Sequence, residues 1–152
     1  MWPYADIATV RLSYRPVSMQ SRRFRADIGN ADGARIAILS TSWQTPALMA
    51  PQDRDYRAFV TQLHARMASA GSRAVLVGGL GPRVYVAAIV CVTLVGMAMA
   101  ALFGRSIATG EWAGALFLIG FTALFAWQVG GFIMRNPPLA YTFDRLPKAL
   151  LP

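Results

Sequence analysis

The chain has 152 residues, of which 55% are hydrophobic and 14% charged, and its formal net charge at pH 7 is +8. This hydrophobic content excludes an intrinsically disordered chain, which would contain far fewer apolar residues. The single cysteine excludes an internal disulfide. The length leaves room for one small folded module beside the most apolar stretches.

The N-terminal part of the chain predicts β-strands. Val10, Leu12 and Tyr14 alternate with polar residues, which is typical of a half-buried strand. Residues 23–28 and 34–40 repeat this alternation on either side of a turn rich in Gly, Asn and Asp, and this arrangement predicts a β-hairpin. Three or four strands fit into this region.

One amphipathic helix is predicted over about 53–70. Tyr56, Leu63 and Met67 fall on one face at helical spacing. Asp53 is expected to be the N-cap, and Gly71 is expected to end the helix.

Two apolar stretches dominate the second half of the chain. Residues 84–104 and 113–134 are each long enough to cross a bilayer, because a helix needs roughly 20 apolar residues to span a hydrocarbon core about 30 Å thick. Residues 105–112 form a short polar turn between them, so the two stretches predict a transmembrane helical hairpin. The Gly- and Pro-containing residues 72–83 are interpreted as a linker, and residues 135–152 as a proline-rich tail that lies along this protein or a partner.

The cations near these stretches predict their orientation. Most of them lie outside the hairpin, and the turn between the spans carries one: Arg66, Arg73 and Arg83 precede the first span, Arg135, Arg145 and Lys148 follow the second, and Arg105 lies between. By the positive-inside rule both termini are cytoplasmic and the turn is periplasmic. No cleavable signal peptide is visible, so the first span is expected to act as an uncleaved insertion signal in a bacterial inner membrane.

Small residues recur on one side of each predicted span. Such faces favour close helix packing in lipid, where the hydrophobic effect does not drive association. Two alternatives remain open: the faces pack against each other, or they also dock onto another subunit. The residues concerned are Gly96, Ala100 and Gly104 in the first span, and Gly120, Ala123, Trp127 and Gly130 in the second.

Clustered arginines are the one feature that suggests a ligand. Arginine binds phosphate oxygens bidentately, and cations near an anionic leaflet gain about 1 kcal/mol each. If Arg11 and Arg25 share the polar face of the sheet, Arg22 and Arg23 stand at its end. The predicted contact with anionic lipid or an acidic partner comprises Arg11, Arg15, Arg22, Arg23 and Arg25.

No catalytic, cofactor-binding or metal-binding pattern is recognisable, and no small-molecule substrate is indicated. His64 has no Cys or acidic residue at ligand spacing, so a structural role is favoured over a metal ligand. Nucleic acid is not an expected partner, because Tyr14 and Phe24 fall on the apolar side of the strand pattern and do not interleave with the arginines.

The stretches Ala5–Leu12 and Ile38–Trp43, with the helix that follows them, resemble the pleckstrin-homology-like domains of bacterial membrane proteins. The resemblance covers the N-terminal domain, residues 1–71, and implies a binding or scaffolding module without enzyme activity. Such domains have more strands than fit here. Either an upstream strand is missing, which would leave an exposed edge, or a partner covers that edge.

These observations predict an α+β membrane protein with a small antiparallel sheet, one amphipathic helix and a transmembrane hairpin. The leading functional hypothesis is a non-enzymatic accessory, scaffold or assembly subunit of a larger inner-membrane complex, in contact with membrane lipids and other integral subunits. The alternative is a membrane-anchored sensor that binds anionic lipid or an acidic partner through the arginines.

Overall fold

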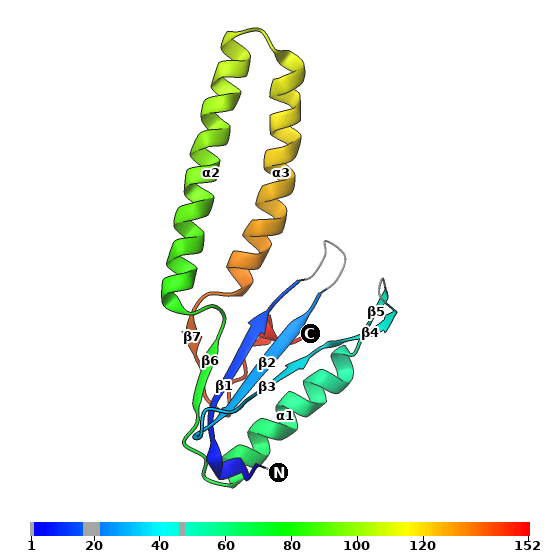
Figure 1. Cartoon of the computed structure of the whole chain (residues 1–152), viewed down its shortest axis with the longest axis vertical. Coiled ribbons are helices and arrows are strands. Elements are labelled where there is room, and N and C mark those ends of the chain that lie inside the picture. The colour runs from blue at the N-terminus through cyan, green and yellow to red at the C-terminus, as the bar shows by residue number, and fades with distance from the viewer. Residues whose placement is uncertain (1, 17–21, 46–47) are drawn as a thin grey trace. The chain divides into compact units, whose positions relative to one another are not determined.

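The computed structural model describes residues 2–16, 22–45 and 48–152 (Figure 1). These residues form two compact units: the sheet domain, made of Met1–Leu80 with Arg135–Pro152, and the helical hairpin, Gly81–Met134. The class is α+β, as the sequence predicted.

The secondary-structure elements follow one another in the order labelled in Figure 1. They are η1 (Tyr4–Asp6), β1 (Ile7–Tyr14), β2 (Phe24–Asn30), β3 (Arg35–Leu39), β4 (Thr41–Thr45), β5 (Leu48–Pro51), α1 (Asp53–Ser69), β6 (Val75–Gly78), α2 (Pro82–Ala108), α3 (Trp112–Arg135), β7 (Leu139–Ala140) and η2 (Lys148–Leu150).

The main sheet has the strand order β3-β2-β1-β6-β7, and β4 and β5 form a separate two-stranded sheet. The β2–β3 hairpin is present as predicted, with antiparallel pairing from Arg25 opposite Leu39 to Gly29 opposite Arg35. Five described strands precede α1, so the expectation of three or four was too low. Two more follow α1, which departs from the pattern of the resemblance, where the helix comes last.

The interpretation of residues 72–83 as a linker is wrong, because they contain β6. This strand pairs in parallel with β1, with Thr9 opposite Val75 and Leu12 opposite Gly78. Its four residues are too few for a period of two to stand out in the sequence. β1 is therefore paired on both sides, with β2 along one edge and β6 along the other.

Helix α1 covers one face of the main sheet (Figure 1). The covered face and the helix supply most of the buried core, including Val10, Leu12 and Ala26 from the strands and Val60 and Met67 from the helix. The opposite face has no layer of described residues over it, and most of its side chains are partly or fully exposed.

The two ends of α1 differ from the sequence expectation in one respect. The helix begins at Asp53, its N-cap is Gln52, and no side chain caps it, so Asp53 is not the N-cap. Gly71 ends the helix as predicted: its φ is +65°, and its N–H donates to the carbonyl of Ala68.

The tail returns to the sheet domain. β7 pairs antiparallel with β6, and Leu150 in η2 is fully buried. The side chains of Leu139 and Leu150 lie over Gly78, where an added Cβ would approach them within 3 Å. Of the two alternatives for the tail, the structure shows that it lies along this protein.

The hairpin consists of α2, with 27 residues, and α3, with 24. At 1.5 Å per residue these helices are about 40 Å and about 36 Å long, enough to cross a hydrocarbon core of about 30 Å. Both are also apolar enough in composition to span a membrane. Their only buried residues are Met99 and Ala115, so almost all of the apolar surface of the hairpin is uncovered.

Candidate functional site

The predicted arginine cluster divides into two groups in the structure. The pairing of β1 with β2 places Arg11 opposite Asp27 and Ser13 opposite Arg25. Because alternate residues of a strand point to the same face, Arg11 and Arg25 share the uncovered face of the sheet. This part of the sequence expectation is confirmed.

Arg25 is occupied by an internal partner. Its Nη2 atom lies 2.6 Å from Oδ1 of Asp27, and its Nε donates to both carboxylate oxygens of Asp27, at 2.8 and 2.9 Å. These hydrogen bonds raise the pKa of Arg25 above its ordinary value. Arg25–Asp27 is the one salt bridge among the described residues. Arg25 and the neighbouring Arg11 therefore face a carboxylate, which makes them poor candidates for binding an anion.

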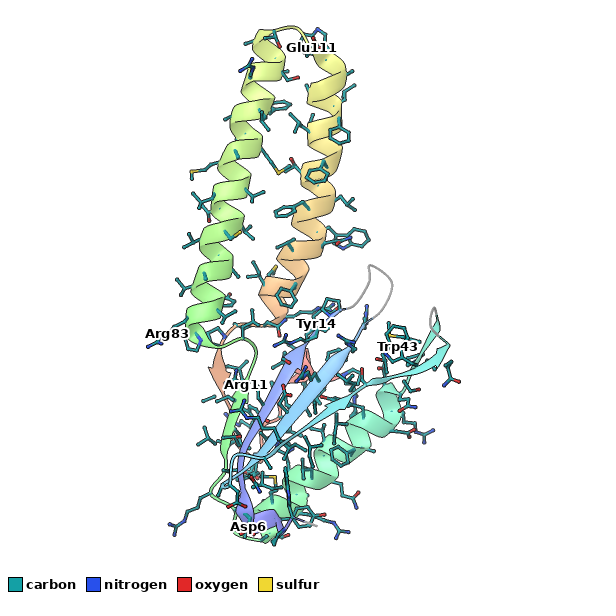
Figure 2. All side chains as sticks on the ribbon, viewed as in Figure 1. Asp6, Arg11, Tyr14, Trp43, Arg83 and Glu111 are labelled. Carbon is teal, nitrogen blue, oxygen red and sulfur yellow. The ribbon has the colours of Figure 1, made fainter. Side chains whose placement is uncertain are left out.

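The second group lies where β1 ends and β2 begins. Figure 2 shows Tyr14 at this end of β1 and Asp6 near the other. The N–H of Arg15 donates to the carbonyl of Arg23 at 2.7 Å, and Nε of Arg23 donates back to the carbonyl of Arg15 at 3.1 Å. Arg15 and Arg22 are exposed and Arg23 is half-buried.

Arg135, the last residue of α3, joins this second group. Its guanidinium carbon lies 4.9 Å from the centre of the Tyr14 ring, within the range of a cation–π interaction. Sequence reasoning used Arg135 only for orientation, because more than a hundred residues separate it from Tyr14. We call Arg15, Arg22, Arg23 and Arg135 the arginine end of the sheet domain.

Asn136 holds the arginine end together. Its side-chain Oδ1 accepts a hydrogen bond from the N–H of Tyr14 at 2.9 Å, and its Nδ2 donates to the carbonyl of Tyr14, also at 2.9 Å. The Asn136 carboxamide thus pairs with both backbone groups of Tyr14, as a neighbouring strand would. Asn136 is fully buried, so these two bonds are shielded from water.

Gly79 approaches Asn136 closely from the other side. Its φ is +74°, and a Cβ at this position would lie 2.6 Å from the carbonyl oxygen of Asn136 and would also collide with that of Pro137. The N–H of Gly79 donates to the carbonyl of Leu12, and that of Leu80 donates to the carbonyl of Asn136. We call Tyr14, Gly79 and Asn136 the clamp; the sequence showed only that Asn136 and the prolines end a helix.

The clamp lies where the chain leaves and re-enters the sheet domain. β6 and β7 pair with each other in the sheet, yet the whole hairpin lies between them in the sequence. The hairpin is therefore an insertion between two adjacent strands. Leu80 on the outgoing side and Asn136 on the returning side are joined by a hydrogen bond of 3.1 Å.

His64 has a structural role in the described part of the chain. It is buried, its Nδ1 lies 2.7 Å from the carbonyl of Val60, and its Nε2 lies 3.1 Å from the Tyr141 hydroxyl. A carbonyl only accepts, so Nδ1 carries the proton and Nε2 accepts from Tyr141. Burial lowers the pKa of His64 and raises that of Tyr141. Both side chains are thus neutral near pH 7, and they join the tail to α1.

The small-residue faces do not pack against each other in the hairpin. An added Cβ at Gly96, Gly104, Gly120 or Gly130 would meet no atom within 4 Å. Ala100, Ala123 and Trp127 are exposed. The structure therefore does not have the first alternative, in which the two small-residue faces contact each other within one hairpin. The second alternative, docking onto another subunit, stays a prediction.

No group of three or more potential metal ligands occurs among the residues that the structure describes. Comparisons of this chain with protein-family models, with curated proteins and with solved structures found no match. The arginine end, the clamp and the uncovered hairpin are therefore the features from which a function is argued.

Proposed function

We propose that this protein is a non-enzymatic accessory or scaffold subunit of a larger complex in a bacterial inner membrane. The hairpin crosses the membrane twice and the sheet domain lies on the cytoplasmic side, together with both termini. The observation that carries the proposal is the insertion of the hairpin between β6 and β7, which ties the domain to its anchor by two chain connections.

Two connections restrain a domain more than one does. A domain on a single glycine-rich linker would sample many orientations. Here the outgoing strand β6 is paired on both sides, and the returning chain is fixed by the Asn136 bonds to Tyr14. Both ends of the hairpin therefore start from fixed points of the domain, which suits a subunit that binds its partners close to the membrane.

The uncovered apolar surface supports contact with other integral subunits. Small residues on the hairpin leave space for the backbone of another helix to approach. In the domain, a pleckstrin-homology-like binding role agrees with the uncovered face of the main sheet and with Trp43, an exposed aromatic residue on β4. Exposed aromatic residues are enriched at protein interfaces.

Co-purification of the tagged full chain from native membranes, with mass spectrometry of the co-eluting chains, tests this proposal. We expect a reproducible set of integral membrane proteins. The double variant Gly96→Leu, Gly120→Leu should lose them, because leucine fills the space that a partner helix needs, while neither position has a neighbour in this chain to clash with.

Ala98→Leu is the matched control. Ala98 is exposed and lies on the opposite side of α2 from Gly96 and Ala100, so a leucine at this position should leave the partners bound. A natural chain that elutes as a monodisperse monomer without partners would contradict the proposal.

A further inference from the structure

The charges of the sheet domain are distributed unevenly along β1. Arg15, Arg22, Arg23 and Arg135 gather where β1 ends, and none of them has a carboxylate within salt-bridge distance among the described residues. Arg25, the second residue of β2 and opposite Ser13, is the one arginine of the described residues that is held by an acidic side chain. The arginine end is thus a concentration of positive charge without an internal counter-charge.

This end is also where the chain passes into and out of the hairpin. Arg135 is the last residue of α3, and the next residue, Asn136, is hydrogen-bonded to Tyr14, which immediately precedes Arg15. Consecutive Cα atoms are 3.8 Å apart, so the backbone of Arg15 lies within a few residue lengths of the end of α3. If α3 ends at a bilayer surface, the arginine end lies beside the headgroups.

We propose that the arginine end binds the phosphate groups of anionic lipids in the same bilayer that holds α2 and α3. This inference rests on the proposed function, since it requires the hairpin to cross a membrane. It also narrows the ligand-binding set that the sequence suggested: Arg11 and Arg25 are excluded because they face Asp27, and Arg135 is added.

The chemistry favours a lipid over an acidic protein as the occupant. A guanidinium presents planar, paired donors that match two phosphate oxygens. A bilayer also presents many phosphates. If α2 and α3 cross that bilayer, they keep the arginine end close to these phosphates. The anchor therefore raises the effective concentration of lipid phosphates at the site and reduces the entropic cost of binding them.

The test uses the full chain in phosphatidylcholine bilayers that contain a minor fraction of phosphatidylglycerol. Spin-labelled forms of the two lipids report, by electron paramagnetic resonance, how much of each is immobilised at the protein. We expect a preference for phosphatidylglycerol of about fivefold or more at low ionic strength. The triple variant Arg15→Gln, Arg22→Gln, Arg23→Gln should bind both lipids almost equally.

The matched control removes three exposed arginines from α1, in the triple variant Arg54→Gln, Arg57→Gln, Arg66→Gln. It changes the net charge by the same amount, and it should keep the preference for phosphatidylglycerol. The proposal is overturned if the natural chain shows no preference, if the first triple variant keeps it, or if the control loses it equally.

Two further measurements separate the possible failures. Flotation of the chain with vesicles after carbonate washing tests the membrane anchor alone; a chain that is washed off refutes both proposals. Binding of a polyglutamate peptide in pure phosphatidylcholine bilayers tests an acidic protein as the occupant. If the arginine end binds this peptide and shows no preference for phosphatidylglycerol, the lipid assignment is wrong although the anchor stands.

Discussion

The sheet domain and the helical hairpin use the same apolar residue types in opposite ways. Leu12 in β1 is 0% exposed, whereas Leu116 in α3 is 70% exposed. The domain buries its large side chains between sheet, helix and tail, as a protein in water does. Hydrophobic exposure along the whole length of the hairpin would be unstable in water, because soluble proteins rarely expose large apolar patches. The contrast agrees with the proposal that lipid surrounds the hairpin while water surrounds the domain.

The largest effect is expected from adding a side chain at Gly79, where two backbone segments of the sheet domain lie close together. Gly79→Ala should destabilise the domain by about 3–5 kcal/mol, because its φ is +74° and a Cβ would collide with the backbone of Asn136 and Pro137. Thermal unfolding of the full chain in detergent would measure this loss.

Two control variants separate the backbone strain from the steric collision in the loss of stability at Gly79. Gly33→Ala, at a φ of +86° with open space around it, should cost only the backbone strain. Gly96→Ala, in open space on the hairpin, should have little effect. Equal losses in all three variants would show that the domain is not packed as closely at Gly79 as described.

A charge placed on each unit tests the difference in solvent directly. Leu124 in α3 is 42% exposed and Ile36 in β3 is 48% exposed, so the two positions are matched in accessibility. Leu124→Arg should oppose membrane insertion by about 3 kcal/mol, because the side chain would enter hydrocarbon, and Ile36→Arg should be tolerated. The amount of carbonate-resistant protein in the membrane fraction measures both. If both variants insert equally well, water and not lipid surrounds the hairpin.

Removing the Asn136 side chain from the clamp should destabilise the sheet domain. Asn136→Ala leaves the N–H and carbonyl of Tyr14 without their partners in a buried position, which should cost about 2–4 kcal/mol. Unfolding of the full chain by denaturant provides the measurement.

Asn30→Ala is the control for the loss of stability at Asn136. The Oδ1 of Asn30 accepts an exposed hydrogen bond from the N–H of Ala34. Asn30→Ala should cost about 1 kcal/mol or less. A similar cost at both positions would mean that the Asn136 bonds are exposed to water.

The smallest effect is a pH dependence that belongs to the domain alone, because His64 is the only histidine in the chain. Its pKa is lowered by burial, so below its ordinary value of 6.5 the unfolded chain binds the proton more readily than the folded one. The stability that neutral His64 contributes is therefore present above pH 6.5 and is lost as the pH falls towards the folded pKa, with a slope of at most about 1.4 kcal/mol per pH unit.

Unfolding measured between neutral and mildly acidic pH would show this slope. In the variant His64→Gln the part of the slope that comes from this histidine should disappear. An unchanged slope in that variant would assign the pH dependence to other groups.

Periodic patterns in the sequence predicted the elements that carry enough residues to show a period. The alternation around Val10 and Leu12 became β1, and the helical spacing of Tyr56 and Met67 became α1. β6 was missed because its four residues were read as part of a glycine-rich joint. Arg11 and Arg25 were correctly placed on one face, yet the sequence did not reveal that Asp27 pairs with Arg25.

The amino-acid sequence by itself determined the α+β class, the hairpin of β2 and β3, and the two long apolar helices, because these depend on the order of apolar and polar residues within a short segment. The tertiary structure alone decided that β6 lies beside β1, that the tail completes the sheet, and that Asn136 binds Tyr14 and brings Arg135 to the arginines of the β1–β2 end. These contacts join residues far apart in the chain. Their energies depend on backbone groups and burial that no local pattern of side chains records.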